Sequence, residues 1–134
     1  MFVLKTNILP IHTENDIVSV RHNVRQWAVE HRFSLIEQTK FVTAASELAR
    51  NALTYGRGGT ATFEALEDGI RKGIRLTFED QGPGIPDLKL AMTDGYTSGG
   101  GLGMGLSGAK RLVNDFEIDS EVGKGTRVRI TRWK

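Results

Sequence analysis

Cysteine is absent from the 134 residues of this chain. Its absence excludes disulfide bonds, thiolate chemistry and cysteine zinc sites, and it fits a reducing cytoplasm. No run approaches the roughly 20 apolar residues that a membrane-spanning helix needs. The first residues also lack the basic region and long apolar core of a secretory signal. The three histidines lack the spacing of a zinc protease motif, and we expect them in the core or in solvent.

An excess of charge of one sign is missing as well. The sequence has 18 Lys and Arg against 16 Asp and Glu, which gives a net charge of +2. The basic residues are spread among the acidic ones and form no stripe with aromatics, so nucleic acid is not an expected partner. With 39% hydrophobic residues, the length predicts one domain over residues 1–134 with a two-layer core.

Glycine, by contrast, is concentrated in one stretch. Six of the twelve residues from Thr97 to Gly108 are glycine. The run leads into a helical pattern that is flanked by Lys110 and Arg111. Unpaired amides and a partial positive charge at a helix N-terminus suit a polyphosphate. The alternative is a disordered linker, but linkers rarely run into an amphipathic helix that carries two cations.

Hydrophobic periodicity predicts an α+β fold. Pro10 confines the first strand to a sheet edge, and Ser34 with Glu37 forms a capping box for the second helix. We expect a two-layer α/β sandwich, in which three main helices cover one face of a mixed, mostly antiparallel sheet. The predicted helices span residues 14–31, 35–53 and 105–115, with a short one at 87–92; the predicted strands span 3–12, 60–66, 74–79, 116–120 and 126–133; residues 67–73 form a turn.

Two further segments carry polar side chains that could take part in binding or catalysis. Glu47 and Asn51 are four residues apart on one helix face, although in isolation they resemble an ordinary solvated pair. Asp80 ends a strand and precedes two glycines spaced by one residue, which indicates a tight turn. No P-loop signature is present. Residues 103–108 match G-x-G-x-x-G, but no strand precedes them, which excludes a Rossmann site. The length excludes a two-lobed protein kinase.

Four segments in order resemble the conserved boxes of one nucleotide-binding superfamily. Residues 47–51 resemble the N box of the GHKL ATPases and kinases (the Bergerat fold), and residues 80–84, 99–105 and 123–126 resemble its three glycine boxes. In its size and in the residues of these segments, the chain resembles the RsbT-like anti-sigma and switch serine/threonine kinases of the bacterial stressosome.

This resemblance implies how an adenine ring would be held. Asp80 would accept a hydrogen bond from the exocyclic amine, and Thr126 would support that contact through water. Gly82 and Gly84 would let the backbone approach the base and the ribose.

The resemblance also implies a catalytic assignment. Asn51 would ligate Mg²⁺, and Glu47 would deprotonate the attacking hydroxyl. Lys110 or Arg111 would add positive charge near the phosphates. The remaining phosphate-binding residues would be Thr97, Ser98, Gly99, Gly100, Gly101, Leu102, Gly103 and Gly105.

A cytoplasmic serine/threonine protein kinase, dependent on ATP and Mg²⁺, is the function that this resemblance implies. Its substrate would be a STAS-domain protein of the RsbS type, or of the RsbR type, in a stress-response or sigma-factor pathway. Release from that partner would activate a phosphatase or another effector. One alternative is an ATP-binding anti-sigma module that sequesters its partner. Another is a histidine-kinase-like catalytic domain, which needs a dimerising helix pair for which this length leaves no room. Homodimerisation through the N-terminal edge strand is a further expectation.

Overall fold

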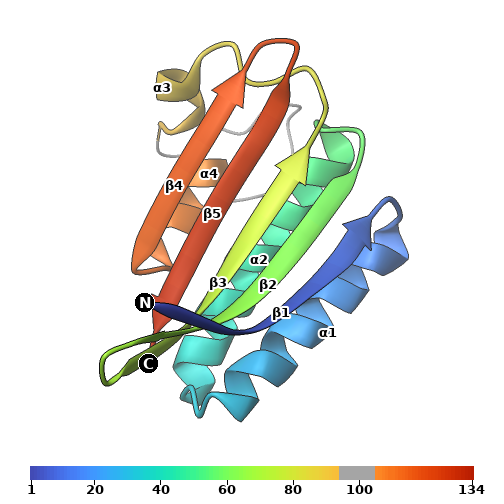
Figure 1. Ribbon diagram of the computed structural model, residues 1–134. Helices are drawn as coiled ribbons and strands as arrows, with labels where there is room; N and C mark the ends of the chain where they lie inside the picture. Colours follow the sequence, from blue (N-terminus) through green and yellow to red (C-terminus); the bar gives the residue numbers. More distant parts are fainter. Residues whose placement is uncertain (94–104) are drawn as a thin grey trace.

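The computed structural model describes residues 1–93 and 105–134. Within these residues, a five-stranded sheet forms one layer and the helices lie behind it as the second (Figure 1). The elements in order are β1 (Phe2–Ile11), α1 (Glu14–Glu30), α2 (Leu35–Thr54), β2 (Gly59–Asp68), β3 (Arg71–Asp80), α3 (Leu88–Ala91), α4 (Gly105–Arg111), β4 (Asp115–Glu121) and β5 (Gly125–Trp133). Among them, no helix is both long and apolar enough to cross a membrane.

The strand order is β1-β2-β3-β5-β4, and each of the four pairings between these strands is antiparallel. The predicted α+β sandwich is therefore confirmed, with a sheet that is fully antiparallel in the described residues rather than mixed. β1 lies at an edge, as Pro10 indicated. The long crossover from β3 to β4 carries α3 and α4, so it brings α4 against α2 on the helical side.

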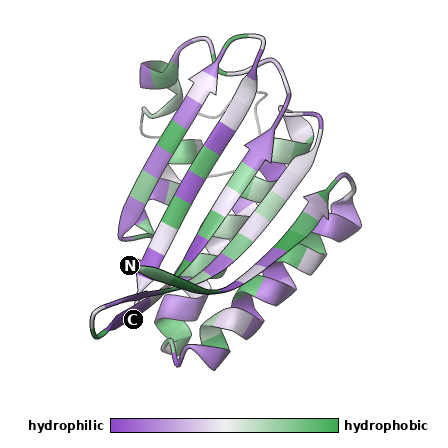
Figure 2. Ribbon diagram, viewed as in Figure 1, coloured by the Kyte–Doolittle hydropathy of each residue, from purple (hydrophilic) through white to green (hydrophobic). Residues whose placement is uncertain are grey.

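Alternating side chains explain why one face of the sheet is covered. Figure 2 shows apolar and polar residues alternating along the central strands, and the apolar ones face the helices. Burying each large apolar side chain contributes about 1.5–3 kcal/mol. The largest fully buried side chains are Phe41, Phe63, Ile11, Ile17, Leu48, Leu66, Ile74, Leu76, Ile130, Val20 and Val24.

The start of α2 is fixed by its capping box. Ser34 Oγ accepts from the Glu37 amide at 3.1 Å, and Glu37 Oε1 accepts from the Ser34 amide at 2.8 Å. Thr13 and Asp16 form a second box at the start of α1, which the sequence did not reveal to us. Because α2 then continues without interruption to Thr54, Glu47 and Asn51 lie in its second half.

Two predicted boundaries were wrong. The helix expected to reach residue 115 ends at Arg111, because the Asn114 amide donates to Thr131 O at 3.0 Å and the Asn114 side chain accepts from the Trp133 amide at 2.7 Å. These contacts draw the chain into the sheet instead. The turn expected at 67–73 is much shorter, since strand pairing continues to Asp68 and Arg71. Gly69, at φ 64, supplies the positive φ that a two-residue hairpin needs.

Candidate functional site

Asp80 ends β3 directly opposite Thr126 of β5. Its Oδ1 accepts a hydrogen bond from the Gly82 amide at 3.0 Å. The side chain is partly buried, and this burial raises the pKa of the Asp80 carboxyl, although hydrogen bonds from the backbone of Gly82 and Thr126 act in the opposite direction. Asp80 is therefore a partly desolvated acceptor whose charge would gain from another donor.

Glycines let the chain pack closely around the Asp80 side chain and the turn that follows it. A Cβ on Gly56 would overlap the Asp80 carboxyl group, and a Cβ on Gly82 would lie 2.7 Å from the Gly56 Cα. Gly84, at φ 78, packs against the Glu121 carbonyl in the same way. Gly82 and Gly84 thus pack closely against the backbone of this chain, and their predicted approach to a base and a ribose stays a prediction. Gly56 was missed, although it lies in the glycine cluster of residues 56–59.

Ser120 is a second residue that the sequence reading missed. Its Oγ lies 2.8 Å from Thr126 Oγ1 and accepts from the Ile85 amide at 2.8 Å. It therefore orients Thr126 and fixes the segment that follows β3 to β4. A serine in a strand pattern gives no signal for this role.

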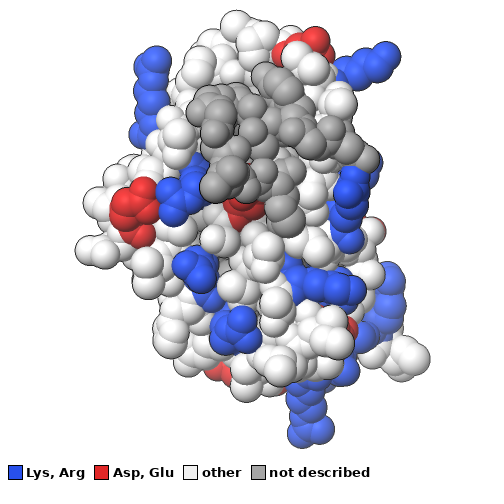
Figure 3. All heavy atoms as spheres, turned by 180° about the vertical axis from the view of Figure 1, so that it is seen from behind, with Lys and Arg blue, Asp and Glu red and all other residues white. Residues whose placement is uncertain are grey.

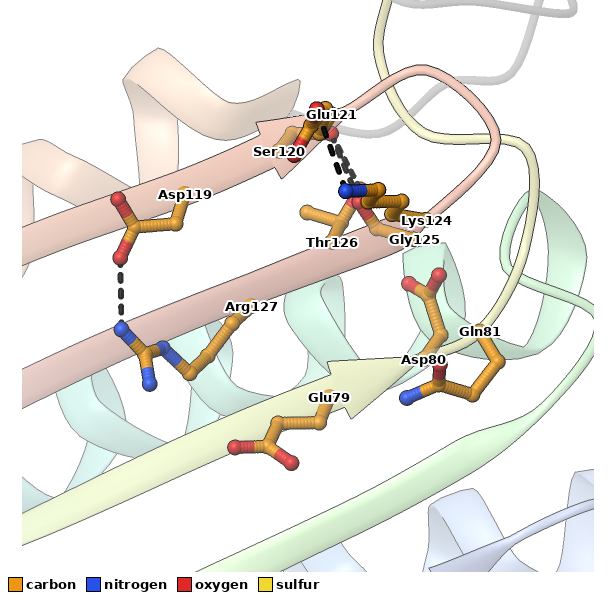
Figure 4. A pocket seen from close by; sticks show the side chains of 10 residues that line it. All are labelled: Glu79, Asp80, Gln81, Asp119, Ser120, Glu121, Lys124, Gly125, Thr126 and Arg127. Atoms are coloured by element: carbon orange, nitrogen blue, oxygen red, sulfur yellow. Dashed lines mark hydrogen bonds and ion pairs between the residues drawn. The ribbon is translucent and has the colours of Figure 1, made fainter.

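A cavity of about 360 Å³ opens at the ends of β3, β4 and β5 (Figure 4). Asp80 and Thr126 line it, together with the ion pair between Arg127 and Asp119 at 2.8 Å. Glu47 is not among its lining residues. This cavity therefore contains the predicted adenine contacts but does not reach the predicted base.

The second half of α2 places Glu47 one turn before Asn51, and both side chains are partly buried. The amide of Gly105, at φ 70, donates to Glu47 Oε1 at 3.1 Å. The resemblance assigns Gly105 to phosphate binding, and in this structure its amide donates to Glu47, the predicted base. The hydrogen bond leaves Glu47 Oε2 as the second acceptor oxygen of the carboxylate.

The end of α2 connects these residues to Asp80. The Asn51 carbonyl accepts from the amides of Tyr55 and Gly56 at 2.9 and 3.1 Å. Since Gly56 in turn packs against the Asp80 carboxyl group, the metal-binding candidate and the adenine-binding candidate lie on either side of one glycine. Two segments that are far apart in the sequence, the end of α2 and the end of β3, are thus brought into one region of the fold.

A divalent cation would have few ligands from the chain itself. In the described residues, no group of three His, Cys, Asp or Glu side chains could hold a metal ion. The single amide oxygen of Asn51 fits Mg²⁺, which takes one or two protein ligands and completes its shell with water and phosphate oxygens. Lys110 and Arg111 are exposed at the end of α4. The phosphate-binding predictions for Thr97, Ser98, Gly99, Gly100, Gly101, Leu102 and Gly103 lie outside the described residues.

Comparison with known proteins agrees with this geometry. The family model described as histidine kinase-, DNA gyrase B- and HSP90-like ATPase matches residues 36–134. The chain belongs to this ATPase family. The match begins at the start of α2 and includes Glu47, Asn51, Asp80 and Thr126, so the predicted superfamily is confirmed over the part of the chain that carries the candidate site.

Individual members of this ATPase family are also similar to the chain. The serine/threonine-protein kinase RsbT of Bacillus subtilis (strain 168) is 44% identical over 123 residues, which are 92% of each chain. An anti-sigma F factor of Geobacillus stearothermophilus is 33% identical over 100 residues, 69% of this chain and 66% of that one. A crystal structure of the RsbU and RsbW domains of a Mycobacterium tuberculosis protein superimposes with a TM-score of 0.65 at 22% identity. It covers 97% of this chain, which spans 33% of that protein, and it supports the fold alone.

Proposed function

We propose that this ATPase-family chain is a serine/threonine protein kinase that uses ATP and Mg²⁺. The predicted enzyme class agrees with the name of the Bacillus subtilis relative, which aligns over 92% of both chains. The observation that carries the proposal is the placement of Glu47, Asn51 and Asp80 around the end of α2 and Gly56. A nucleotide that contacts Asp80 with its base could then present its phosphates to Asn51 and Glu47.

Asp80 selects the base in this proposal. Its carboxylate accepts from the exocyclic amine of adenine, where guanine presents a carbonyl oxygen. Thr126, held by Ser120 at 2.8 Å, supports that contact through water. Gly82 and Gly84 let the turn beside the base and ribose pack closely on the backbone of Gly56 and Glu121.

Asn51 holds the metal through its side-chain oxygen. Mg²⁺ bound there would offset the charge of the β- and γ-phosphate oxygens. Residues 97–103 and Gly105 surround the phosphates, with Lys110 or Arg111 as an additional cation. Each of these roles is carried over from the GHKL family to the matching residue of this chain.

Glu47 is the proposed general base. It removes the proton from a serine or threonine hydroxyl of a second protein as that oxygen attacks the γ-phosphorus, and ADP leaves with the electron pair of the broken bond. The Gly105 amide holds Oε1 of Glu47, so Oε2 is the oxygen that faces the incoming hydroxyl. A base of this kind contributes about 10²- to 10⁴-fold in rate.

The protein substrate is a STAS-domain protein of the RsbS or RsbR type, in a sigma-factor or stress-response pathway of the cytoplasm. Release from that substrate frees the kinase, here a single domain over residues 1–134, to activate a phosphatase or another effector. The edge strand β1, with Phe2, Val3, Leu4 and Ile8 exposed, is the proposed contact of a homodimer.

Phosphate transfer tests this proposal directly. The purified protein is incubated with γ-labelled ATP, Mg²⁺ and a purified STAS-domain protein, and the Glu47→Gln variant serves as the matched control. The variant keeps an oxygen for the Gly105 amide but lacks a base, so we expect transfer about 10²- to 10⁴-fold slower with ATP affinity within about twofold of wild type. Transfer by the variant at the wild-type rate would refute the role of Glu47.

A sequestering module is the second candidate, and the 33% identity to an anti-sigma F factor favours it. In that case the protein forms a nucleotide-dependent complex with its partner, no label appears on the partner, and Glu47→Gln binds as wild type does. A histidine-kinase-like activity would instead yield an acid-labile phosphohistidine.

A further inference from the structure

One exposed stripe of α2 leads directly to the proposed base. Ile36, Lys40, Thr43 and Glu47 follow one another at spacings of four, three and four residues, which places them along one side of the helix. The first three are exposed, and Ile36 keeps 69% of its surface accessible. Leu35 is exposed as well, whereas Phe41, Val42 and Leu48 of α2 are buried. This stripe is therefore an exposed part of the helix that a partner could contact on its way to Glu47.

The dimensions of a protein interface make contact with this stripe necessary. This step rests on the proposed function, in which a folded protein brings its serine to Glu47. Because a helix rises 1.5 Å per residue, Lys40 and Ile36 lie about 10 and 16 Å from Glu47 along the axis. A standard interface of about 800 Å² per partner corresponds to a patch of about 16 Å radius. A substrate centred on Glu47 therefore covers Lys40 and reaches Ile36.

The charges around the stripe indicate the chemistry of the partner. Figure 3 shows Lys and Arg side chains spread over the helical side of the molecule, with few carboxylates between them. Two carboxylates of this side already have cationic partners: Glu14 pairs with Arg50 at 3.1 Å and Glu37 with Lys134 at 3.7 Å. Lys40 forms no ion pair within residues 1–93 and 105–134. Its charge is available to a carboxylate of the substrate.

We propose that Ile36, Lys40 and Thr43 form a docking ridge for the protein substrate. The substrate surface that fits it carries a carboxylate opposite Lys40 and an apolar side chain opposite Ile36, both near its acceptor hydroxyl. Specificity for the partner then comes from α2 itself, the helix that also carries the base. Docking on this ridge supplies binding energy for the substrate, which lowers KM without changing the chemical step at Glu47.

Charge reversal and apolar truncation on the ridge provide the test. Lys40→Glu and Ile36→Ser are compared with wild type in the transfer assay, with a purified STAS-domain protein as the substrate. We expect KM for that protein to rise at least fivefold in each variant, while KM for ATP and kcat at saturation stay within twofold. The contribution of this pair to the salt dependence of KM changes sign in Lys40→Glu, because salt weakens an attractive pair in wild type and a repulsive pair in the variant.

Matched controls come from other surfaces of the molecule. Ile8 is 59% exposed and pairs with Thr62, whose neighbours Ala61 and Phe63 point toward the helices, so Ile8 lies on the opposite sheet face. Lys5 is exposed on the edge strand β1, where it pairs with Glu30 of α1 at 3.8 Å. Ile8→Ser and Lys5→Glu should leave KM for the substrate within twofold of wild type.

Calorimetry with the ADP-bound protein separates this proposal from the kinase proposal. A dissociation constant for the STAS-domain protein that is unchanged in both ridge variants overturns the docking assignment and leaves the kinase function intact. Ridge-dependent binding without any phosphate transfer overturns the kinase function and retains the docking ridge. Failure of wild-type protein to bind overturns the partner class.

Discussion

Replacing Asp80 by asparagine should weaken nucleotide binding and stabilise the protein in the same step. The amide keeps an oxygen for the Gly82 amide, which now donates to Asp80 Oδ1 at 3.0 Å. It replaces the other oxygen by a donor, which opposes the exocyclic amine of adenine. Losing a hydrogen bond to a charged group costs about 1.5–3 kcal/mol, so we expect ATP to bind about 10- to 150-fold more weakly.

The stability change follows from the pKa of Asp80, which burial raises above the ordinary value of 3.8. A carboxyl with a raised pKa in the folded protein opposes folding once it ionises. This cost is absent below the unfolded pKa, grows as the pH rises through the folded pKa, and is complete above it. Asp80→Asn should therefore have the higher free energy of unfolding at pH 7, and its advantage over wild type should shrink as the pH falls toward 4.

Calorimetry with ADP or a non-hydrolysable ATP analogue measures the affinity, and urea unfolding at several pH values measures the stability. Glu117→Gln is the matched control, because this carboxyl is exposed on β4 and is not among the residues that line the cavity; it should change neither quantity appreciably. Affinity within twofold of wild type would exclude the adenine contact. A variant less stable than wild type at pH 7 would show that the charge of Asp80 is not penalised by burial.

Four further substitutions test the packing around the site and the charges of the fold. Gly56→Ala places a methyl group on the Asp80 carboxyl; overpacking should cost about 1–3 kcal/mol in urea unfolding, with at least tenfold weaker nucleotide binding by calorimetry. Glu64→Ala breaks the ion pair between Arg75 and Glu64, whose side chains are 16% and 18% exposed. The variant should lose about 1–3 kcal/mol of unfolding free energy in urea, because Arg75 is left largely buried and unpaired. Asp68→Ala breaks the exposed pair with Arg71 and should lose less than about 1 kcal/mol. Glu37→Gln removes a carboxyl whose pKa is lowered from 4.5, first by the Ser34 amide; the stability that this charge adds at pH 7 should disappear as the pH falls below 4.5, so the unfolding curves of wild type and variant should converge in acid.

Local patterns in the sequence were sufficient for most of the secondary structure. Pro10 indicated an edge strand, Ser34 with Glu37 indicated the start of α2, and the alternation around Leu76 indicated β3. Each of these signals acts over a few residues: proline lacks an amide donor, a capping box holds the first turn of a helix, and apolar residues alternate along a strand. The end of α4 was missed because it depends on Asn114 contacting residues of β5 that follow 17 to 19 positions later.

The candidate site was only partly accessible to the same reasoning. Asp80, Glu47 and Asn51 were found through the resemblance of their segments to conserved boxes, and the structure brings their surroundings together. The contact between Gly56 and Asp80 could not be predicted, because it joins the end of a helix to the end of a strand 24 residues later. Ser120 was missed for a similar reason: its hydroxyl acts on Thr126 across a strand pair, and no pattern within β4 reports it.

Gly56 also explains why base selection and metal binding would act as one rigid unit. Its amide is held by the Asn51 carbonyl, and its missing side chain is what admits the Asp80 carboxyl group. Any shift of the end of α2 therefore moves Asn51, the candidate metal ligand, and at the same time crowds Asp80, the candidate adenine contact. Burial of the Asp80 charge is unfavourable in the protein alone, and a ligand that offers a donor offsets this cost, whereas guanine, with a carbonyl oxygen at that position, adds repulsion. In the proposed site, a preference for adenine would thus follow from the partly desolvated carboxylate of Asp80, which Gly56 packs against.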